Sequence, residues 1–286
     1  MRWLIYGFSL LLFSASVGAG TLAFLLYKYG KGLPDYGQLA NYKPPVVTRV
    51  HSGDGRLIAE YAKERRVFIP INVMPKLLIK AFLSSEDKNF FEHSGIDPVS
   101  LMNAAINNLL NFYKNKRPRG ASTITQQVAK NFLLSNEISL ERKIKEAILA
   151  FRIEKAFSKN RILELYLNEI YLGMGSYGVA AAALNYFDKS LDELTVEEVA
   201  YLAALPKAPN NYHPVRKRSA AVARRNWVIQ KMHENGFISE TTMKLAKSIE
   251  LKTKPKSETE FVDAKYFVED VRRKLVSKFG STRLYS

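Results

Sequence analysis

One stretch near the N-terminus restricts the chain more than any other: residues 3–27 carry no charged side chain. About 20 apolar residues in a helix are enough to cross the hydrocarbon core of a membrane. The rival interpretation is a cleaved signal peptide, since Val17, Gly18 and Ala19 form a weak cleavage-like site of small residues. However, the uncharged stretch exceeds the roughly 7–15 apolar residues of a signal peptide and continues past that site. We therefore expect residues 1–32 to be a retained transmembrane anchor.

The chain as a whole is basic, and this limits its partners. Its 43 Lys and Arg against 27 Asp and Glu give a formal net charge of +16. Such a charge attracts polyanions, so nucleic acid, an anionic membrane and a phosphorylated substrate are all candidates. The chain has no cysteine, which excludes disulfides, thiolate metal sites and cysteine nucleophiles. With four histidines and no HExxH pair, a histidine-based zinc site has little support.

Past the uncharged stretch, the sequence predicts a mostly helical protein. Residues 48–71 favour two extended segments around an Asp54-Gly55 turn, as in a β-hairpin. Asp97-Pro98 predicts a helix start, because aspartate caps a helix and proline suits its first position. Two later pairs, Thr123 with Gln126 and Thr195 with Glu198, have the spacing of a capping box.

The segment from residue 140 to 151 predicts a helix with one buried face. The residues at helical spacing are Leu140, Ile144, Ala147, Ile148 and Phe151. Arg142, Lys143 and Glu146 lie off that predicted stripe. Their i, i+3 and i, i+4 spacing suits ion pairs on a helix face, and taken alone they favour an ordinary solvated surface.

Two further stretches carry polar groups with an ambiguous meaning. Residues 84–97, SSEDKNFFEHSGID, crowd four carboxylates, a lysine and a histidine around two phenylalanines. On its own this favours the polar rim of a helix end, with an acid–base or metal site as alternatives. Residues 119–131, RGASTITQQVAKN, bring hydroxyls to a helix start, where free N–H groups suit a phosphate. Taken alone, that stretch favours an ordinary capped surface helix, with the phosphate site as the alternative.

Two familiar patterns are set aside. Residues 173–178 match GxGxxG, but they follow a helical pattern, whereas dinucleotide binding requires a preceding strand. Residues 85–88 match SxxK, but no SDN or KTG element accompanies them.

Taken together, the ordered motifs resemble the glycosyltransferase (peptidoglycan polymerase) domain of class A penicillin-binding proteins and of monofunctional peptidoglycan glycosyltransferases. They are Glu86-Asp87 with Phe90, His93 and Gly95; GASTITQQVAKN at 120–131; Arg142-Lys143 and Glu146 with ELYLN at 164–168; GMGSYG at 173–178 with YFDK at 186–189; and ALPKAP at 204–209 with RRNWV at 224–228. These motifs cover roughly residues 80–232. Two departures stand out: Ala121 replaces a glycine, and Asn103 lies where an arginine is expected.

The resemblance implies a mostly α, lysozyme-like glycosyltransferase domain over residues 33–250, with a small membrane-associated subdomain, preceded by the transmembrane helix. Residues 251–286 are then expected to begin a linker toward a transpeptidase domain, whose motifs this sequence lacks. The implied location is the outer, periplasmic face of the cytoplasmic membrane. The implied partners are lipid II, the lipid-linked glycan chain, the membrane and other cell-wall synthesis proteins, with no role for nucleic acid.

The implied activity is polymerisation of lipid II into glycan strands with release of undecaprenyl pyrophosphate. By motif position, Glu86 is the catalytic base. Glu146 is the second catalytic glutamate, which would orient cations, bind a divalent cation (Mg or Mn) or assist the leaving group; no metal ligand is assigned. The implied substrate-binding residues are Ser122, Thr123, Gln127, Lys130, Asn131, Arg142 and Lys143. The implied supporting residues are Asp87, Phe90 and His93.

Two other functions stay open. A lysozyme-like hydrolase or lytic transglycosylase also places glutamates across a glycan. The cations around Glu146 argue against it, since cleavage of a neutral glycosidic bond needs no pyrophosphate clamp. A membrane-tethered polyanion-binding protein would use the net charge alone and would give Glu86 no role.

Overall fold

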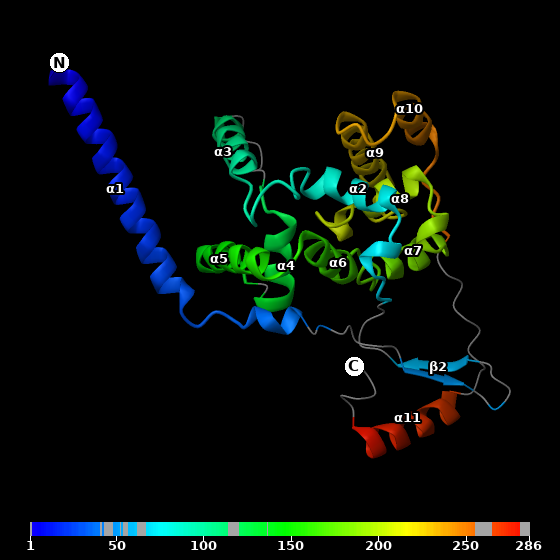
Figure 1. Cartoon of the computed structure of the whole chain (residues 1–286). Helices are drawn as coiled ribbons and strands as arrows, with labels where there is room; N and C mark the ends of the chain where they lie inside the picture. Colours follow the sequence, from blue (N-terminus) through cyan, green and yellow to red (C-terminus); the bar gives the residue numbers. More distant parts are fainter. Residues whose placement is uncertain are drawn as a thin grey trace. The chain divides into compact units, whose positions relative to one another are not determined.

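The computed structural model describes residues 2–40, 42, 48–51, 53, 57–61, 67–113, 120–135, 137–254 and 265–280, and this part is mostly helical (Figure 1). The long helices are α1 (Arg2–Gly30), α2 (Lys76–Glu86), α3 (Pro98–Tyr113), α4 (Ile124–Leu133), α5 (Leu140–Ala156), α6 (Lys159–Glu169), α7 (Val179–Phe187), α8 (Val196–Leu202), α9 (Arg218–Glu234), α10 (Glu240–Ser248) and α11 (Lys265–Phe279). The short helical turns are η1 (Tyr36–Leu39), η2 (Ile71–Val73), η3 (Leu191–Glu193) and η4 (Pro209–Asn211), and the strands are β1 (Thr48–His51) and β2 (Leu57–Tyr61).

The chain forms two compact units. Unit 1 comprises Met1–Asn41 and His93–Ser158, and unit 2 comprises Tyr42–Glu92 and Lys159–Ser286. The residues of the predicted site are divided between them, with Glu86 in unit 2 and Glu146 in unit 1. The domain boundaries predicted from the sequence, at residues 32 and 250, remain predictions.

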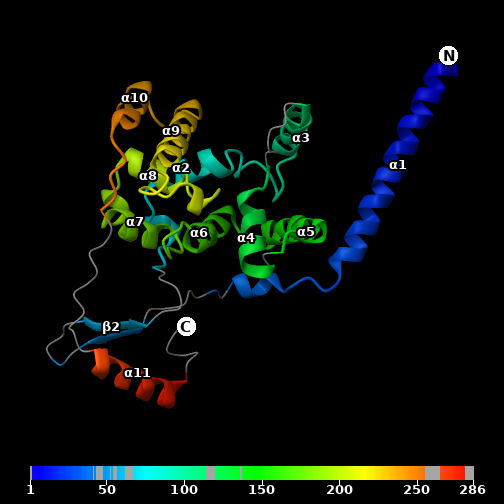
Figure 2. The ribbon, with the colours of Figure 1, turned by 180° about the vertical axis from the view of Figure 1, so that it is seen from behind.

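Unit 1 is organised around α5. Helix α4 lies against α5 in both views, and α1 and η1 also contact α5 (Figures 1 and 2). Helix α1 is continuous over 29 residues. Among the residues that the structure describes, no helix combines the length and the apolar character needed to cross a membrane.

The buried face of α5 differs from the one predicted. Leu140 and Phe151, which belong to the predicted core stripe, are 79% and 47% exposed. The side chains that α5 buries are Glu146, Leu149, Ala150 and Ile153. Apolar residues occur on several sides of this helix, so periodicity alone offers two stripes, and packing selects the one that contains Glu146. The prediction of a solvated face for Glu146 is therefore wrong.

The predicted start of α3 is confirmed. The side chain of Asp97 accepts hydrogen bonds from the N–H of Ser100 at 3.0 Å and from the Ser100 hydroxyl at 2.6 Å, and Pro98 is the first helical residue. This arrangement satisfies an N–H group of the first turn that has no partner within the helix.

Unit 2 is built on α2, which packs against α8 and α9 (Figure 1). Its core includes Phe82 from α2, Tyr166 from α6 and Tyr201 from α8, each at most 1% exposed. The predicted capping box of Thr195 with Glu198 is present at the start of α8.

The predicted hairpin is also confirmed: β1 pairs antiparallel with β2. The Asp54-Gly55 turn itself lies outside the described residues.

Two contacts of Asn168 hold the segments at Ile69 and Gly178 against α6. The side chain of Asn168, 3% exposed, accepts from the N–H of Ile69 at 2.8 Å and donates to its carbonyl at 2.9 Å and to that of Glu164 at 2.8 Å. Gly178 has φ of +79°, and a Cβ there would lie 2.5 Å from the carbonyl oxygen of Asn168. Only glycine allows this close approach.

We predict that Asn168→Ala destabilises the protein by roughly 2–4 kcal/mol, because it leaves both backbone groups of Ile69 without their partner. Urea unfolding measures the change. Asn160→Ala is the matched control, since Asn160 lies on the same helix and is exposed. Equal stability of the two variants would contradict the prediction.

Candidate active site

The start of α4 is held by a reciprocal capping box. The N–H of Gln126 donates to Thr123 Oγ1 at 3.2 Å, and the N–H of Thr123 donates to Gln126 Oε1 at 3.0 Å. The Thr123 hydroxyl donates in turn to the carbonyl of Gly95 at 2.6 Å. The capping prediction is therefore confirmed. Thr123 is buried and ties the start of α4 to the segment that follows His93.

That segment passes close to α5. Gly95 has φ of +93°, and a Cβ there would lie 2.8 Å from the carbonyl oxygen of Ala150. His93 is buried and its Nδ1 accepts from the N–H of Gly95 at 3.2 Å. The close approach to α5 explains the glycine. The supporting role of His93 remains a prediction.

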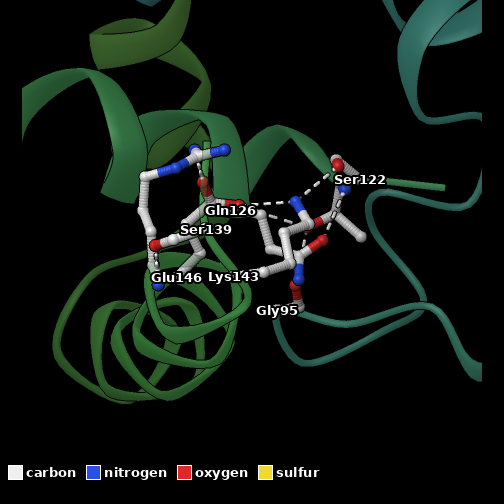
Figure 3. A network of polar contacts seen from close by, with 8 residues as sticks. Gly95, Ser122, Gln126, Ser139, Lys143 and Glu146 are labelled. Carbon is white, nitrogen blue, oxygen red and sulfur yellow. Dashed lines mark hydrogen bonds and ion pairs between the residues drawn. The ribbon is translucent and has the colours of Figure 1, made fainter. Parts of the chain in front are cut away.

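A cation cluster lies beside the start of α4 (Figure 3). Arg142 and Lys143 each form an ion pair with Glu146, using different carboxylate oxygens. Lys143 also donates to the Ser122 hydroxyl at 2.7 Å. Glu146 is only 1% exposed, and these two partners offset the cost of burying its carboxylate. We call Ser122, Arg142, Lys143 and Glu146 the cation cluster.

The cluster carries more positive than negative charge. The backbone N–H of Arg142 donates to the hydroxyl of Ser139, the N-cap residue of α5, at 3.1 Å. The Arg142 Nε is buried and has no hydrogen-bond partner in the part of the chain that the structure describes. Two cations share one carboxylate, and the Ser122 hydroxyl lies beside them. This combination suits the binding of an anion with several oxygens, such as a phosphate.

One face of α4 carries the remaining predicted ligands of unit 1. Gln127, Lys130 and Asn131 are half-buried and follow Thr123 at positions i+4, i+7 and i+8, so they share a face of the helix. On another side, the Thr125 hydroxyl donates to Glu154 of α5 at 2.5 Å. Roles for Gln127, Lys130 and Asn131 in substrate binding remain predictions.

In unit 2, Glu86 is the last residue of α2. Asp87 caps that helix end and is 7% exposed. Phe90 is fully buried, and the Lys159 ammonium lies 4.4 Å from the centre of its ring. Asp87 and Phe90 are therefore buried close to Glu86 in the sequence, and their supporting roles remain predictions.

Two residues near Glu86 were missed as site residues. Burial raises the pKa of the Tyr166 hydroxyl well above its usual value, and the negative charges of Glu86 and Asp87 raise it further. Burial lowers the pKa of Arg224, whereas the charge of Glu86 opposes that shift. Both residues therefore lie in the field of Glu86. They stand inside motif segments, ELYLN and RRNWV, so the signal was present but assigned no role.

The described residues offer little for a metal ion. Among them, no group of three or more histidines, aspartates and glutamates is arranged to hold one. Glu146 engages both carboxylate oxygens with cations. Two cations that surround a single carboxylate suit an anionic ligand better than a metal ion.

Comparison with known proteins identifies the family. A family model described as Transglycosylase matches residues 54–233. The chain belongs to the transglycosylase family. This match covers the predicted motifs from Glu86 to the RRNWV segment, so all the residues of the candidate site lie within the transglycosylase region.

The relatives of this transglycosylase chain are longer proteins. It is 51% identical over 265 residues to penicillin-binding protein 1A of Rickettsia prowazekii, covering 93% of this chain and 34% of that protein. It is 40% identical over 283 residues to penicillin-binding protein 1A of Escherichia coli, covering 99% of this chain and 33% of that protein. The chain thus spans about one third of the length of these curated relatives.

A solved structure also matches the transglycosylase chain. The crystal structure of penicillin-binding protein 1A from Haemophilus influenzae superimposes with a TM-score of 0.51 at 28% identity, covering 85% of this chain and 26% of that one. The resemblance to the glycosyltransferase domain of class A penicillin-binding proteins is therefore confirmed.

We predict that Glu146→Ala destabilises the protein by roughly 2–4 kcal/mol, because it leaves the Arg142 guanidinium without its partner in a mostly buried position. Thermal and urea unfolding measure the loss. Glu141→Ala is the matched control on the same helix, because its ion pair with Lys145 is solvent-exposed and should contribute little. A Glu146→Ala variant as stable as the control would contradict the prediction.

Proposed function

We propose that the chain is a peptidoglycan glycosyltransferase that polymerises lipid II into glycan strands. Family membership and the five ordered motifs support this proposal. The single observation that carries it is the cation cluster, in which two cations share a buried glutamate beside a serine hydroxyl. A leaving pyrophosphate gains negative charge as its bond to the sugar breaks, and preorganised cations stabilise such charge.

Glu86 is the proposed general base. It takes the proton of the C4 hydroxyl as that oxygen bonds to the anomeric carbon of the growing glycan. The bond from the anomeric carbon to the pyrophosphate oxygen breaks, and its electron pair leaves with undecaprenyl pyrophosphate. A sugar hydroxyl is a weak nucleophile near neutral pH, so this proton transfer contributes a large part of the rate.

Arg142, Lys143 and Lys130 are the proposed pyrophosphate ligands, with Ser122 and Gln127 as hydrogen-bond donors and Asn131 beside them. Thr123, expected from the motif to bind substrate, is buried and directs its hydroxyl and its N–H to Gly95 and Gln126, so we propose that it holds the start of α4 instead. Of the three roles open to Glu146, its ion pairs favour the first, the orientation of the two cations. A Mg or Mn ion bound by Glu146 would compete with both ion pairs. The proposed mechanism therefore assigns no step to a metal ion.

The proposed enzyme works at the outer face of the cytoplasmic membrane. Helix α3 supports a membrane-associated subdomain, because it exposes the side chains of Val99, Leu101, Met102, Ile106, Leu109 and Leu110. Contiguous exposed apolar side chains mark surfaces that contact a membrane or another protein. The anchor over residues 1–32 and the interaction with other cell-wall synthesis proteins remain predictions.

We expect Glu86→Gln to lower glycan polymerisation from lipid II by at least about 100-fold, since the amide cannot accept the proton. The far-UV spectrum and the melting temperature should stay unchanged. Glu92→Gln is the control, because Glu92 is an exposed carboxylate six residues further along. Normal polymerisation by folded Glu86→Gln would overturn the assignment of the base. If the unaltered chain shortened glycan strands instead of extending them, the hydrolase alternative would hold.

We expect Lys143→Gln to lower kcat/KM for lipid II by about 100-fold, because it removes one cation aimed at the developing charge. Lys145→Gln is the matched control, since Lys145 is two residues away and pairs with exposed Glu141 instead. The same polymerisation assay measures both variants. Equal losses in the two would show that overall charge, and not the cation cluster, matters.

A further inference from the structure

The buried tyrosines of unit 2 differ in how their hydroxyls are satisfied. Tyr186 donates to the carbonyl of Leu172 at 2.8 Å, and Tyr201 donates to the carbonyl of Tyr212 at 2.8 Å. Tyr166 is 1% exposed, and its hydroxyl is buried with no hydrogen-bond partner among the described residues. A buried hydroxyl without a partner costs free energy, so phenylalanine would serve the packing better.

The packing of Tyr166 brings it to the end of α2. Its ring meets that of Phe82 edge to face, with ring centres 6.4 Å apart. Phe82 and Glu86 are four residues apart on α2, so their side chains share a face of that helix. Tyr166 therefore packs one helical turn from the proposed base. The effect of the Glu86 charge on Tyr166 agrees with this placement.

Two charged groups near Glu86 in the described part of the chain are Asp87 on the same turn and Arg224 from α9. The Arg224 guanidinium lies 3.9 Å from the centre of the Trp227 ring, and its Nε is buried without a hydrogen-bond partner among the described residues. From α8, Tyr201 directs its hydroxyl to the carbonyl of Tyr212. Glu86 thus lies in the field of a buried neutral donor and a half-buried cation, and neither the Tyr166 hydroxyl nor the Arg224 Nε has a hydrogen-bond partner among the described residues.

We propose that Tyr166 is a positioning residue for Glu86: its hydroxyl donates a hydrogen bond to the ionised carboxylate as the substrate binds. This inference rests on the proposed role of Glu86 as general base. The hydroxyl is too buried to meet the substrate itself, so it acts through the carboxylate. Because burial and the nearby negative charges keep its proton in place, it acts only as a donor.

A hydrogen bond donated to the charged form lowers the pKa of a carboxylate. Its loss in Tyr166→Phe should therefore raise the pKa of the base, so that the acid limb of the pH profile of kcat/KM moves to higher pH. We expect a shift of about one unit, which one hydrogen bond to a charged group can produce. Asp87 and Arg224 are unchanged in this variant, so their effects cancel in the comparison.

The test compares Tyr166→Phe with Tyr186→Phe in the lipid II polymerisation assay. Tyr166→Phe should lower kcat about tenfold and leave KM unchanged, with a melting temperature equal to or above that of the unaltered chain. Tyr186→Phe should do the reverse: it lowers the melting temperature, because it removes a satisfied buried bond, and leaves kcat and the pH profile unchanged.

A purely structural role for Tyr166 predicts a different result. In that case Tyr166→Phe keeps the kcat and the pH profile of the unaltered chain, and the inference is overturned. Glu86→Gln, measured alongside, separates this failure from that of the proposed function. If Glu86→Gln is inactive and Tyr166→Phe is normal, only the positioning role falls. If Glu86→Gln polymerises normally, the base assignment falls and the inference falls with it.

Discussion

The buried carboxylate of Glu146 is the constraint on which the polar site of unit 1 depends. A charge that is 1% exposed must be paired, and Arg142 and Lys143 supply the partners from the same helix. Pairing fixes both cations, and Lys143 then reaches the Ser122 hydroxyl beside the capped start of α4. The Thr123 hydroxyl continues the connection to Gly95. A cluster held in this way meets a ligand without first having to reorganise, which is the physical basis of preorganised electrostatic stabilisation.

Local signals in the sequence predicted local structure well. Asp97-Pro98 marks the start of α3, and Thr123 with Gln126 forms the expected capping box, because each signal involves groups within one helical turn. The face of α5 was predicted wrongly for the opposite reason. Which side of a helix is buried depends on α4 and α1, and no pattern within residues 140–156 encodes those neighbours.

The same difference between local and long-range signals explains which residues of the site could be predicted from the sequence. Motif order assigned Glu86, Glu146 and the cations, because a motif records residue types at fixed spacing. It gave no role to Tyr166 or Arg224, although both lie in motif segments. Their importance comes from burial and unused hydrogen-bonding capacity beside Glu86, which depend on how α2, α6 and α9 pack. Such properties belong to the folded chain and leave no mark in its spacing.

The two glutamates are surrounded in different ways, and this difference favours the different roles proposed for them. Glu146 accepts from a cation at each carboxylate oxygen, and both partners come from its own helix, so it holds Arg142 and Lys143 in fixed positions. Glu86 lies in the field of a tyrosine hydroxyl and an arginine Nε, and neither donor has a hydrogen-bond partner in the part of the chain that the structure describes. Those donors can adjust as a carboxylate changes charge during proton transfer. A glutamate held between two cations therefore suits the fixed positioning of those cations, and one with adaptable donors near it suits the proposed role of a base.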